Sequence, residues 1–191
     1  MYWQRVWGWF TYGELYSEMV KRFGDDAVFV EIGVWLGKST LYMAEEIKKS
    51  GKNIKFYAID PFEICGKMID PFPVPARKGQ PWTMEQSYFH DHWKKVSEPV
   101  KDYVQLLKGY SYDEVRGFED ESIDFVFIDG EHDYESVKKD IKDWLPKVKK
   151  GGVIAGHDYV QIHQGVIQAV TELLPMSIIL HEQESWYYEK T

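Results

Sequence analysis

The stretch that decides the fold is residues 30–40, which read VEIGVWLGKST. It continues an apolar run over 27–32 that is interrupted only by Glu31, and such a run is typical of a buried strand. After Gly37, apolar residues recur at the spacing of a helix. The stretch therefore predicts a strand, a glycine turn and a helix start, a geometry in which bare backbone N–H groups can approach a ligand.

The alternation of strand and helix patterns continues along most of the chain. Further strands are predicted at 55–60, 103–108, 123–129 and 153–156, and helical periodicity marks 15–23, 112–118, 137–148 and 166–174. Residues 177–181 and 186–189 alternate in polarity around a polar turn, which predicts an antiparallel hairpin. Strands that alternate with helices predict an α/β fold with a parallel sheet and helices on both faces.

Composition excludes several classes of function. The net charge is −8 and no basic run is present, so nucleic acid is not expected as a partner. The single cysteine, Cys65, cannot form an internal disulfide, which favours a reducing, cytoplasmic location. No stretch approaches the roughly 20 apolar residues of a membrane span. The length predicts one domain over residues 1–191.

Residues 61–99 differ from the rest of the chain because they hold six of the eight prolines. A lid-like insertion is one interpretation, and an irregular surface connection or subunit contact is the other. We expect a helix within 84–96.

The glycine loop allows three ligand classes. Gly37-Lys38-Ser39 matches the tail of a phosphate-binding P-loop, but three residues separate the glycines where that loop needs four. A dinucleotide loop needs a glycine where Trp35 stands. The third class fits better: Glu31, the two glycines and Asp60 after the next strand suit an adenosine that carries a cationic sulfonium and an amino acid.

At these residues the sequence resembles the class I S-adenosylmethionine-dependent methyltransferases, closest to their O-methyltransferase-like group. The resemblance rests on E-I-G-x-x-x-G-x-S-T at 31–40, I-D-G-E-H-D-Y at 128–134, and G-G-V-I-A-G-H-D-Y at 151–159. It covers about residues 12–60 and 103–175 and omits the proline-rich segment.

The resemblance implies a Rossmann-like seven-stranded sheet of order 3-2-1-4-5-7-6 with S-adenosylmethionine as cofactor. The loop residues Glu31, Gly33, Gly37 and Ser39 would hold its methionine part, and Asp60 its ribose. Gly109, Ser111 and Asp129 complete the implied cofactor-binding set, although Tyr110 departs from the aspartate more frequent at that position.

The implied strand order brings Asp129 close to His157 and Asp158. Relatives that methylate hydroxyls often hold magnesium at these places, so the three residues form a candidate metal site. A nitrogen ligand suits manganese, iron or zinc better than magnesium. Alternatively, His157 or His132 acts as the general base for the acceptor hydroxyl, with Asp158 at the same site.

The sequence thus predicts O-methylation of a small polar acceptor, a sugar or sugar-containing metabolite, by a protein that is a candidate homo-oligomer. A P-loop-like nucleotide hydrolase and a non-catalytic or metal-oxygenase-like relative are the alternatives. Trp144 is expected in the core, Asp133 at a helix start and Asp140 on a solvated face. The aromatic residues at the start of the chain are expected to line an acceptor pocket or to cover the cofactor or a partner subunit; they are Trp3, Trp7, Trp9, Phe10 and Tyr12.

Overall fold

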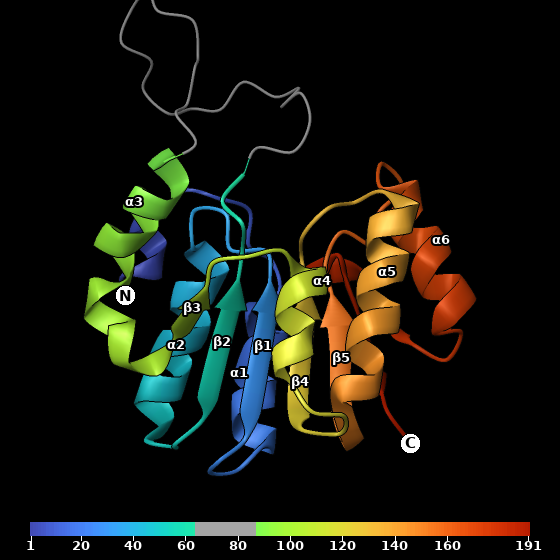
Figure 1. The fold of residues 1–191 in the computed structure, drawn as a ribbon, viewed down its shortest axis with the longest axis horizontal. Helices are drawn as coiled ribbons and strands as arrows, with labels where there is room; N and C mark the ends of the chain where they lie inside the picture. The colour runs from blue at the N-terminus through green and yellow to red at the C-terminus, as the bar shows by residue number, and fades with distance from the viewer. Residues whose placement is uncertain (64–86) are drawn as a thin grey trace, which may run out of the picture.

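A single sheet organises the chain, for which the computed structural model describes residues 1–63 and 87–191. The strands are β1 (Val28–Ile32), β2 (Lys55–Ile59), β3 (Gln105–Leu107), β4 (Ile123–Ile128), β5 (Val148–Gly156), β6 (Ile178–Leu180) and β7 (Ser185–Glu189). They lie in the order β3-β2-β1-β4-β5-β7-β6, and β7 is antiparallel to both of its neighbours, β5 and β6, whereas the other pairs are parallel. The predicted fold class, strand order and terminal hairpin are confirmed. Figure 1 shows the first five strands of this order, from β3 to β5.

Helices cover both faces of this sheet (Figure 1). The longer ones are α1 (Gly13–Arg22), α2 (Lys38–Ser50), α3 (Ser87–Ser97), α5 (Tyr134–Trp144) and α6 (Gln164–Leu173), and α4 (Ser111–Glu114) is a single turn. Short 3-10 turns lie at Trp3–Arg5, Glu98–Tyr103, Val115–Gly117, Leu145–Lys147 and His181–Gln183. Side chains of α1, α2 and α3 pack against one face of the sheet and form one core layer with it. Side chains of α5 and α6 pack against the other face and form the second core layer.

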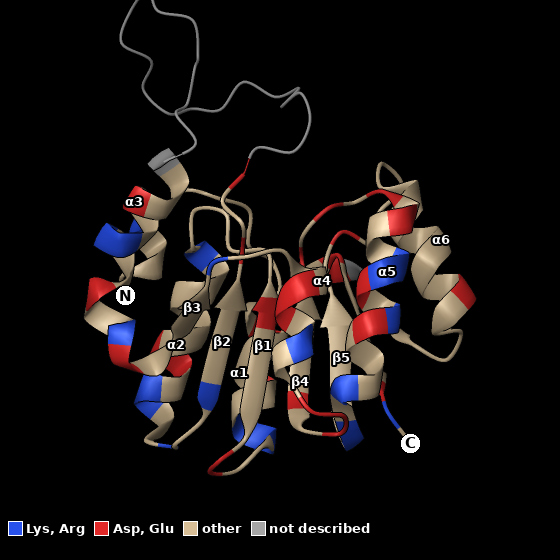
Figure 2. Cartoon of the chain, in the orientation of Figure 1, with Lys and Arg blue, Asp and Glu red and all other residues tan. Residues whose placement is uncertain are grey.

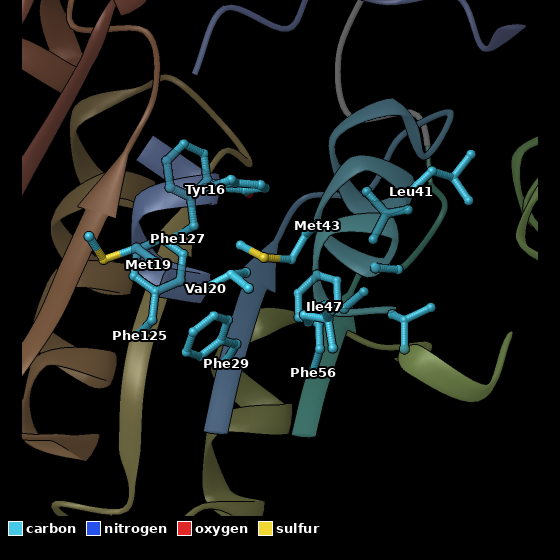
Figure 3. Close-up of a cluster of buried hydrophobic side chains, with 14 of the residues drawn as sticks. Tyr16, Met19, Val20, Phe29, Leu41, Met43, Ile47, Phe56, Phe125 and Phe127 are labelled. Carbon is cyan, nitrogen blue, oxygen red and sulfur yellow. The ribbon is translucent and has the colours of Figure 1, made fainter. Parts of the chain in front are cut away.

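The alternation of side chains along the central strands creates these two layers. Phe29 of β1 and Phe125 and Phe127 of β4 point toward α1 and α2, where Met19 and Met43 join them (Figure 3). Their neighbours along each strand point to the opposite face and pack with α5 and α6. Because both faces are covered, these strands are mostly apolar, with Glu31 in β1 and Asp124 in β4 as the charged residues.

One predicted boundary was wrong. Val148 was expected on a helix, but it is the first residue of β5, which extends well before the predicted 153–156. The α-helix ends at Trp144 because Pro146 cannot continue it. The early part of β5 joins the sheet through a register shift, with Gly151 in a left-handed conformation at φ +74°.

The proline-rich segment is described at its two ends. Helix α3 is described from Ser87 to Ser97, which agrees with the helix expected within 84–96, and it buries Phe89 and Trp93 against the first core layer. Residues 64–86 lie outside the described residues, so the lid-like role of 61–99 stays a prediction.

Two further features follow from the packing. Trp144 is fully buried in the second core layer, as expected. Within 1–63 and 87–191, no helix combines the length and the apolar character that crossing a bilayer requires.

Candidate functional site

The glycine loop between β1 and α2 passes over the end of the sheet and requires both of its glycines. Gly33 has φ +93°, and a Cβ built there would lie 2.0 Å from the carbonyl oxygen of Asp129. Gly37 has φ +89°, and a Cβ there would lie 2.9 Å from the ring of Trp93. The left-handed backbone and the close approach together exclude any side chain at these positions.

Asp60, directly after β2, holds this loop in place. Its Oδ2 accepts hydrogen bonds from the backbone N–H groups of Val34 (2.7 Å) and Trp35 (2.9 Å), and its Oδ1 accepts one from Phe62 (2.6 Å). Burial raises the pKa of Asp60, while the three N–H donors oppose that shift. A carboxylate oxygen can accept two hydrogen bonds, so Oδ1 keeps one acceptor position for a ligand.

A cavity of about 1080 Å³ opens where β1, β2, β4 and β5 end. Of the residues predicted to bind the cofactor, Gly33, Ser39, Asp60, Ser111 and Asp129 line it. Acidic residues gather around it, notably in the loop that leads from β4 to α5 (Figure 2). The carboxyl ends of parallel strands at a switch in strand order are where such sheets bind ligands.

Three of the predicted cofactor residues do not line this cavity. Gly37 packs on Trp93 instead, Gly109 faces Glu114, and Glu31 lies deeper, between the loop and α1. Glycines at such positions shape the backbone without offering a side chain.

Glu31 is a buried carboxyl with incomplete hydrogen bonding. Its side chain is 1% exposed, and its Oε1 accepts a hydrogen bond from the hydroxyl of Tyr16 at 2.9 Å. Its Oε2 has no hydrogen-bond partner among the described residues. Burial raises the pKa of Glu31 to about 7, and the hydroxyls of Ser39, Thr40 and Tyr16 offset part of that shift.

His157, at the end of β5, is held between a hydroxyl and two carboxylates. Its Nε2 lies 2.9 Å from Thr11 Oγ1, and its Nδ1 lies 3.6 Å from Asp129 and 3.4 Å from Asp158. The single proton of Thr11 is donated to the carbonyl of Gln183 at 2.8 Å, so His157 must donate its own Nε2–H to Thr11. Burial lowers the pKa of His157, but the two carboxylates outweigh it and raise the pKa to about 10.

Asp158 is shared by three histidines. His132 Nε2 lies 2.8 Å from its Oδ2, and His163 Nε2 lies 3.7 Å from its Oδ1. Burial raises the pKa of Asp158, but hydrogen bonds from His132 and His157 outweigh that effect and hold the pKa below its usual range. Burial lowers the pKa of His132, and Asp158 more than compensates, so the net shift is upward.

The predicted metal residues are close enough to share one ion. Ligand atoms of Asp129, His157 and Asp158 lie within 4.8 Å of one another, and a second set, His132, Asp158 and His163, meets the same limit. Donors about 2.0–2.2 Å from a tetrahedral ion stand roughly 3.4 Å apart. In the first set, the distances of 3.6 and 3.4 Å from His157 Nδ1 to the two carboxylates are close to that spacing, and the imidazole suits manganese, iron or zinc better than magnesium.

Sequence reasoning placed one site residue wrongly and left another out. Asp140 was expected on a solvated face, but it lines the cavity and accepts a hydrogen bond from Ser111, and burial raises its pKa to about 6. The sequence spacing could have shown this. Asp140 stands three residues after Val137 and four before Trp144, and therefore lies on the same face of α5 as these two buried residues. Thr11 carried no such signal, because its contacts join opposite ends of the chain.

Two other residues are placed as the sequence suggested. Asp133 caps α5 by accepting hydrogen bonds from the backbone N–H groups of Glu135 and Ser136. Tyr12, from the aromatic start, lines the cavity and donates to Asp129 Oδ2 at 2.6 Å.

Removal of the Asp60 carboxylate tests the loop directly. Asp60→Ala is expected to weaken binding of S-adenosylhomocysteine by roughly 2 kcal/mol, about 30-fold, because three backbone N–H groups lose their charged acceptor. Isothermal titration calorimetry measures the change. Asp120→Ala, which removes an exposed carboxylate paired with Lys147, is the matched control. Equal affinities for the two variants would contradict the role given to Asp60.

Comparison with known proteins agrees with this geometry. The methyltransferase-domain family matches residues 30–159. An uncharacterized protein of Acanthamoeba polyphaga mimivirus is 32% identical over 139 residues, which are 71% of this chain and 52% of that protein. The chain therefore spans about half the length of this relative.

Solved structures show the same fold. The O-methyltransferase NovP superposes with a TM-score of 0.62 at 19% identity, covering 95% of this chain and 80% of that one. CalS11, a TDP-rhamnose 3'-O-methyltransferase of calicheamicin biosynthesis, gives 0.62 at 16% identity, covering 93% and 76%. The sheet order, the glycine loop and the acid after β2 define a class I S-adenosylmethionine-dependent methyltransferase fold. The match over residues 30–159 shows that the chain belongs to the methyltransferase-domain family.

Proposed function

We propose that this protein transfers the methyl group of S-adenosylmethionine to a hydroxyl group of a small polar acceptor. One observation carries the proposal: a single cavity joins the glycine loop and Asp60 to the cluster of His132, His157 and Asp158. A methyl donor held by the loop and a hydroxyl held at the histidines would share this space. The family match favours this function over a P-loop nucleotide hydrolase.

In this proposal His132 is the general base. Its Nε2 faces the carboxylate of Asp158, which leaves Nδ1 to take the proton of the acceptor hydroxyl. Asp158 orients the ring and stabilises the imidazolium that forms. The acceptor oxygen then forms a bond to the methyl carbon, the carbon–sulfur bond breaks with its electron pair moving to sulfur, and S-adenosylhomocysteine leaves.

His157 is less suited to that task. Its Nε2–H is committed to Thr11, and its Nδ1 faces two carboxylates, so no ring nitrogen remains to receive a substrate proton. We propose that it belongs with Asp129 and Asp158 to a site for a divalent ion that tolerates nitrogen. Such an ion, when bound, would lower the pKa of the acceptor hydroxyl and orient it.

The acceptor class follows from the same cavity and from relatives of similar fold. CalS11 is by name a sugar O-methyltransferase and NovP an O-methyltransferase. The histidines and carboxylates that line the cavity here are groups that hydrogen-bond hydroxyls. Both points support a sugar or a sugar-containing metabolite.

The test is calorimetric titration with S-adenosylhomocysteine and, separately, with ATP. We expect micromolar binding of S-adenosylhomocysteine and no measurable binding of ATP. Repetition with manganese and with magnesium measures whether an ion binds to the same protein. Tight ATP binding without S-adenosylhomocysteine binding would reject the proposed function.

A further inference from the structure

The first residues of the chain cross the mouth of the cavity. We call residues 8–12 the strap. The carbonyl of Gly8 accepts a hydrogen bond from Lys38 Nζ at 2.8 Å, at the start of α2. Thr11 bonds to His157 and to the carbonyl of Gln183, and Tyr12 bonds to Asp129. The strap is thus fixed at one end to the cofactor loop and at the other to the cluster proposed for catalysis.

Between those anchors the strap presents Trp9 to the cavity. Trp9 is 65% exposed, although it is among the most apolar side chains of the protein. Its ring stacks on Trp35, with centroids 5.8 Å apart and planes 9° apart. Trp7 packs edge-on against both rings, at 4.9 and 5.2 Å. One face of Trp9 is therefore supported by a rigid aromatic cluster.

The polar groups in the same cavity limit what can lie against this ring. Carboxylates of Asp129, Asp158 and Glu184 line it together with the three histidines. Its two lysines are engaged elsewhere, Lys38 with Gly8 and Lys139 with Asp143. An anionic group would meet repulsion here, whereas hydroxyl groups would find acceptors.

We propose that Trp9 is a binding subsite for the acceptor and stacks against one face of a neutral pyranose ring. The C–H groups on that face carry slight positive charge and suit the negative face of an indole. The ring hydroxyls would then point to carboxylates and imidazoles beyond Thr11, which itself contacts His157. This inference rests on the proposed function, because the pyranose supplies the hydroxyl that is methylated.

Saturation-transfer difference NMR tests the subsite in the 191-residue protein with S-adenosylhomocysteine bound. The probes are methyl glycosides of glucopyranose, galactopyranose and rhamnopyranose, with catechol and glucose 6-phosphate as separate arms. We expect saturation of ring C–H protons in at least one glycoside. Trp9→Ala should weaken its binding by roughly tenfold, the scale of a lost stacking contact, and Trp9→Phe should retain most of it.

Tyr2→Ala is the matched control, because Tyr2 is another exposed aromatic residue of the N-terminal segment and does not line the cavity. It should leave both ligands unaffected, and Trp9→Ala should bind S-adenosylhomocysteine like wild type. Three results would overturn the subsite while the methyltransferase function stands. The first is that no glycoside binds, and the second is that Trp9→Ala leaves the affinity for the glycoside unchanged. The third is that Trp9→Ala weakens the binding of catechol or glucose 6-phosphate only. Failure of wild type to bind S-adenosylhomocysteine would reject the function itself, and this inference with it.

Discussion

His132→Gln is expected to lower turnover by about 10²- to 10⁴-fold, the usual contribution of a general base, and to leave the affinity for S-adenosylhomocysteine nearly unchanged. The reason is that the two ring nitrogens of His132 have different roles. Nε2 faces Asp158, and Nδ1 remains to accept the hydroxyl proton. Single-turnover methylation measures the rate, and calorimetry measures the affinity.

The pH dependence separates a base from a structural hydrogen bond. A base works only when unprotonated. Burial lowers the pKa of His132 but Asp158 outweighs this and raises it, so the wild-type rate should begin to fall at a higher pH than it would for an ordinary histidine. Asp158→Asn removes that charge and should move this fall to lower pH, besides reducing the rate. His90→Gln, on α3 and outside the lining of the cavity, is the control and should retain the wild-type pH profile. A fully active His132→Gln variant would show that His132 is not the general base.

Glu31→Gln is expected to stabilise the ligand-free protein at pH 8 by up to roughly 3 kcal/mol. Burial raises the pKa of Glu31 from 4.5 to about 7, so the folded protein holds this proton more tightly than the unfolded chain does. The free energy of unfolding therefore falls as the pH rises from about 4.5 through about 7. A difference of about 2.5 pKa units, at 1.36 kcal/mol each, gives the expected magnitude.

Urea denaturation of both proteins between pH 4 and pH 8 measures this effect. The stabilities of the two proteins should be equal near pH 4, diverge between about pH 4.5 and about pH 7, and differ by a nearly constant amount at higher pH. Glu18→Gln, on the exposed side of α1, makes the same change in net charge and serves as the control. A wild-type protein as stable as Glu31→Gln at pH 8 would show that the buried carboxyl is solvated or paired.

The central sheet could be predicted from sequence because its signals are local. Each parallel strand is an apolar run followed by a turn, and the glycine at position 33 is required by its left-handed backbone and its approach to Asp129. The beginning of β5 could not be predicted in this way. Val148 continues the helical spacing of α5, and only pairing with Ile123 makes it a strand residue.

The site could be predicted where each functional residue follows a strand. Asp60, Asp129 and Asp158 all stand at such ends, and the fold brings them to one cavity. The role of Thr11 depends on contacts with His157 and Gln183, 146 and 172 residues away in the chain, and no local pattern encodes these. Asp60 likewise orders the glycine loop through backbone N–H groups. Every residue except proline has such a group, so the sequence does not show which of them Asp60 binds.

Trp35 would couple the two ligands of the proposed function to each other. Its backbone N–H is bound to Asp60 in the cofactor loop, whereas its ring supports Trp9 at the mouth of the cavity. A ligand that shifts the backbone of this residue would also shift the ring on which Trp9 stacks. The coupling must be reciprocal, so any gain in acceptor affinity caused by the cofactor equals the gain in cofactor affinity caused by the acceptor.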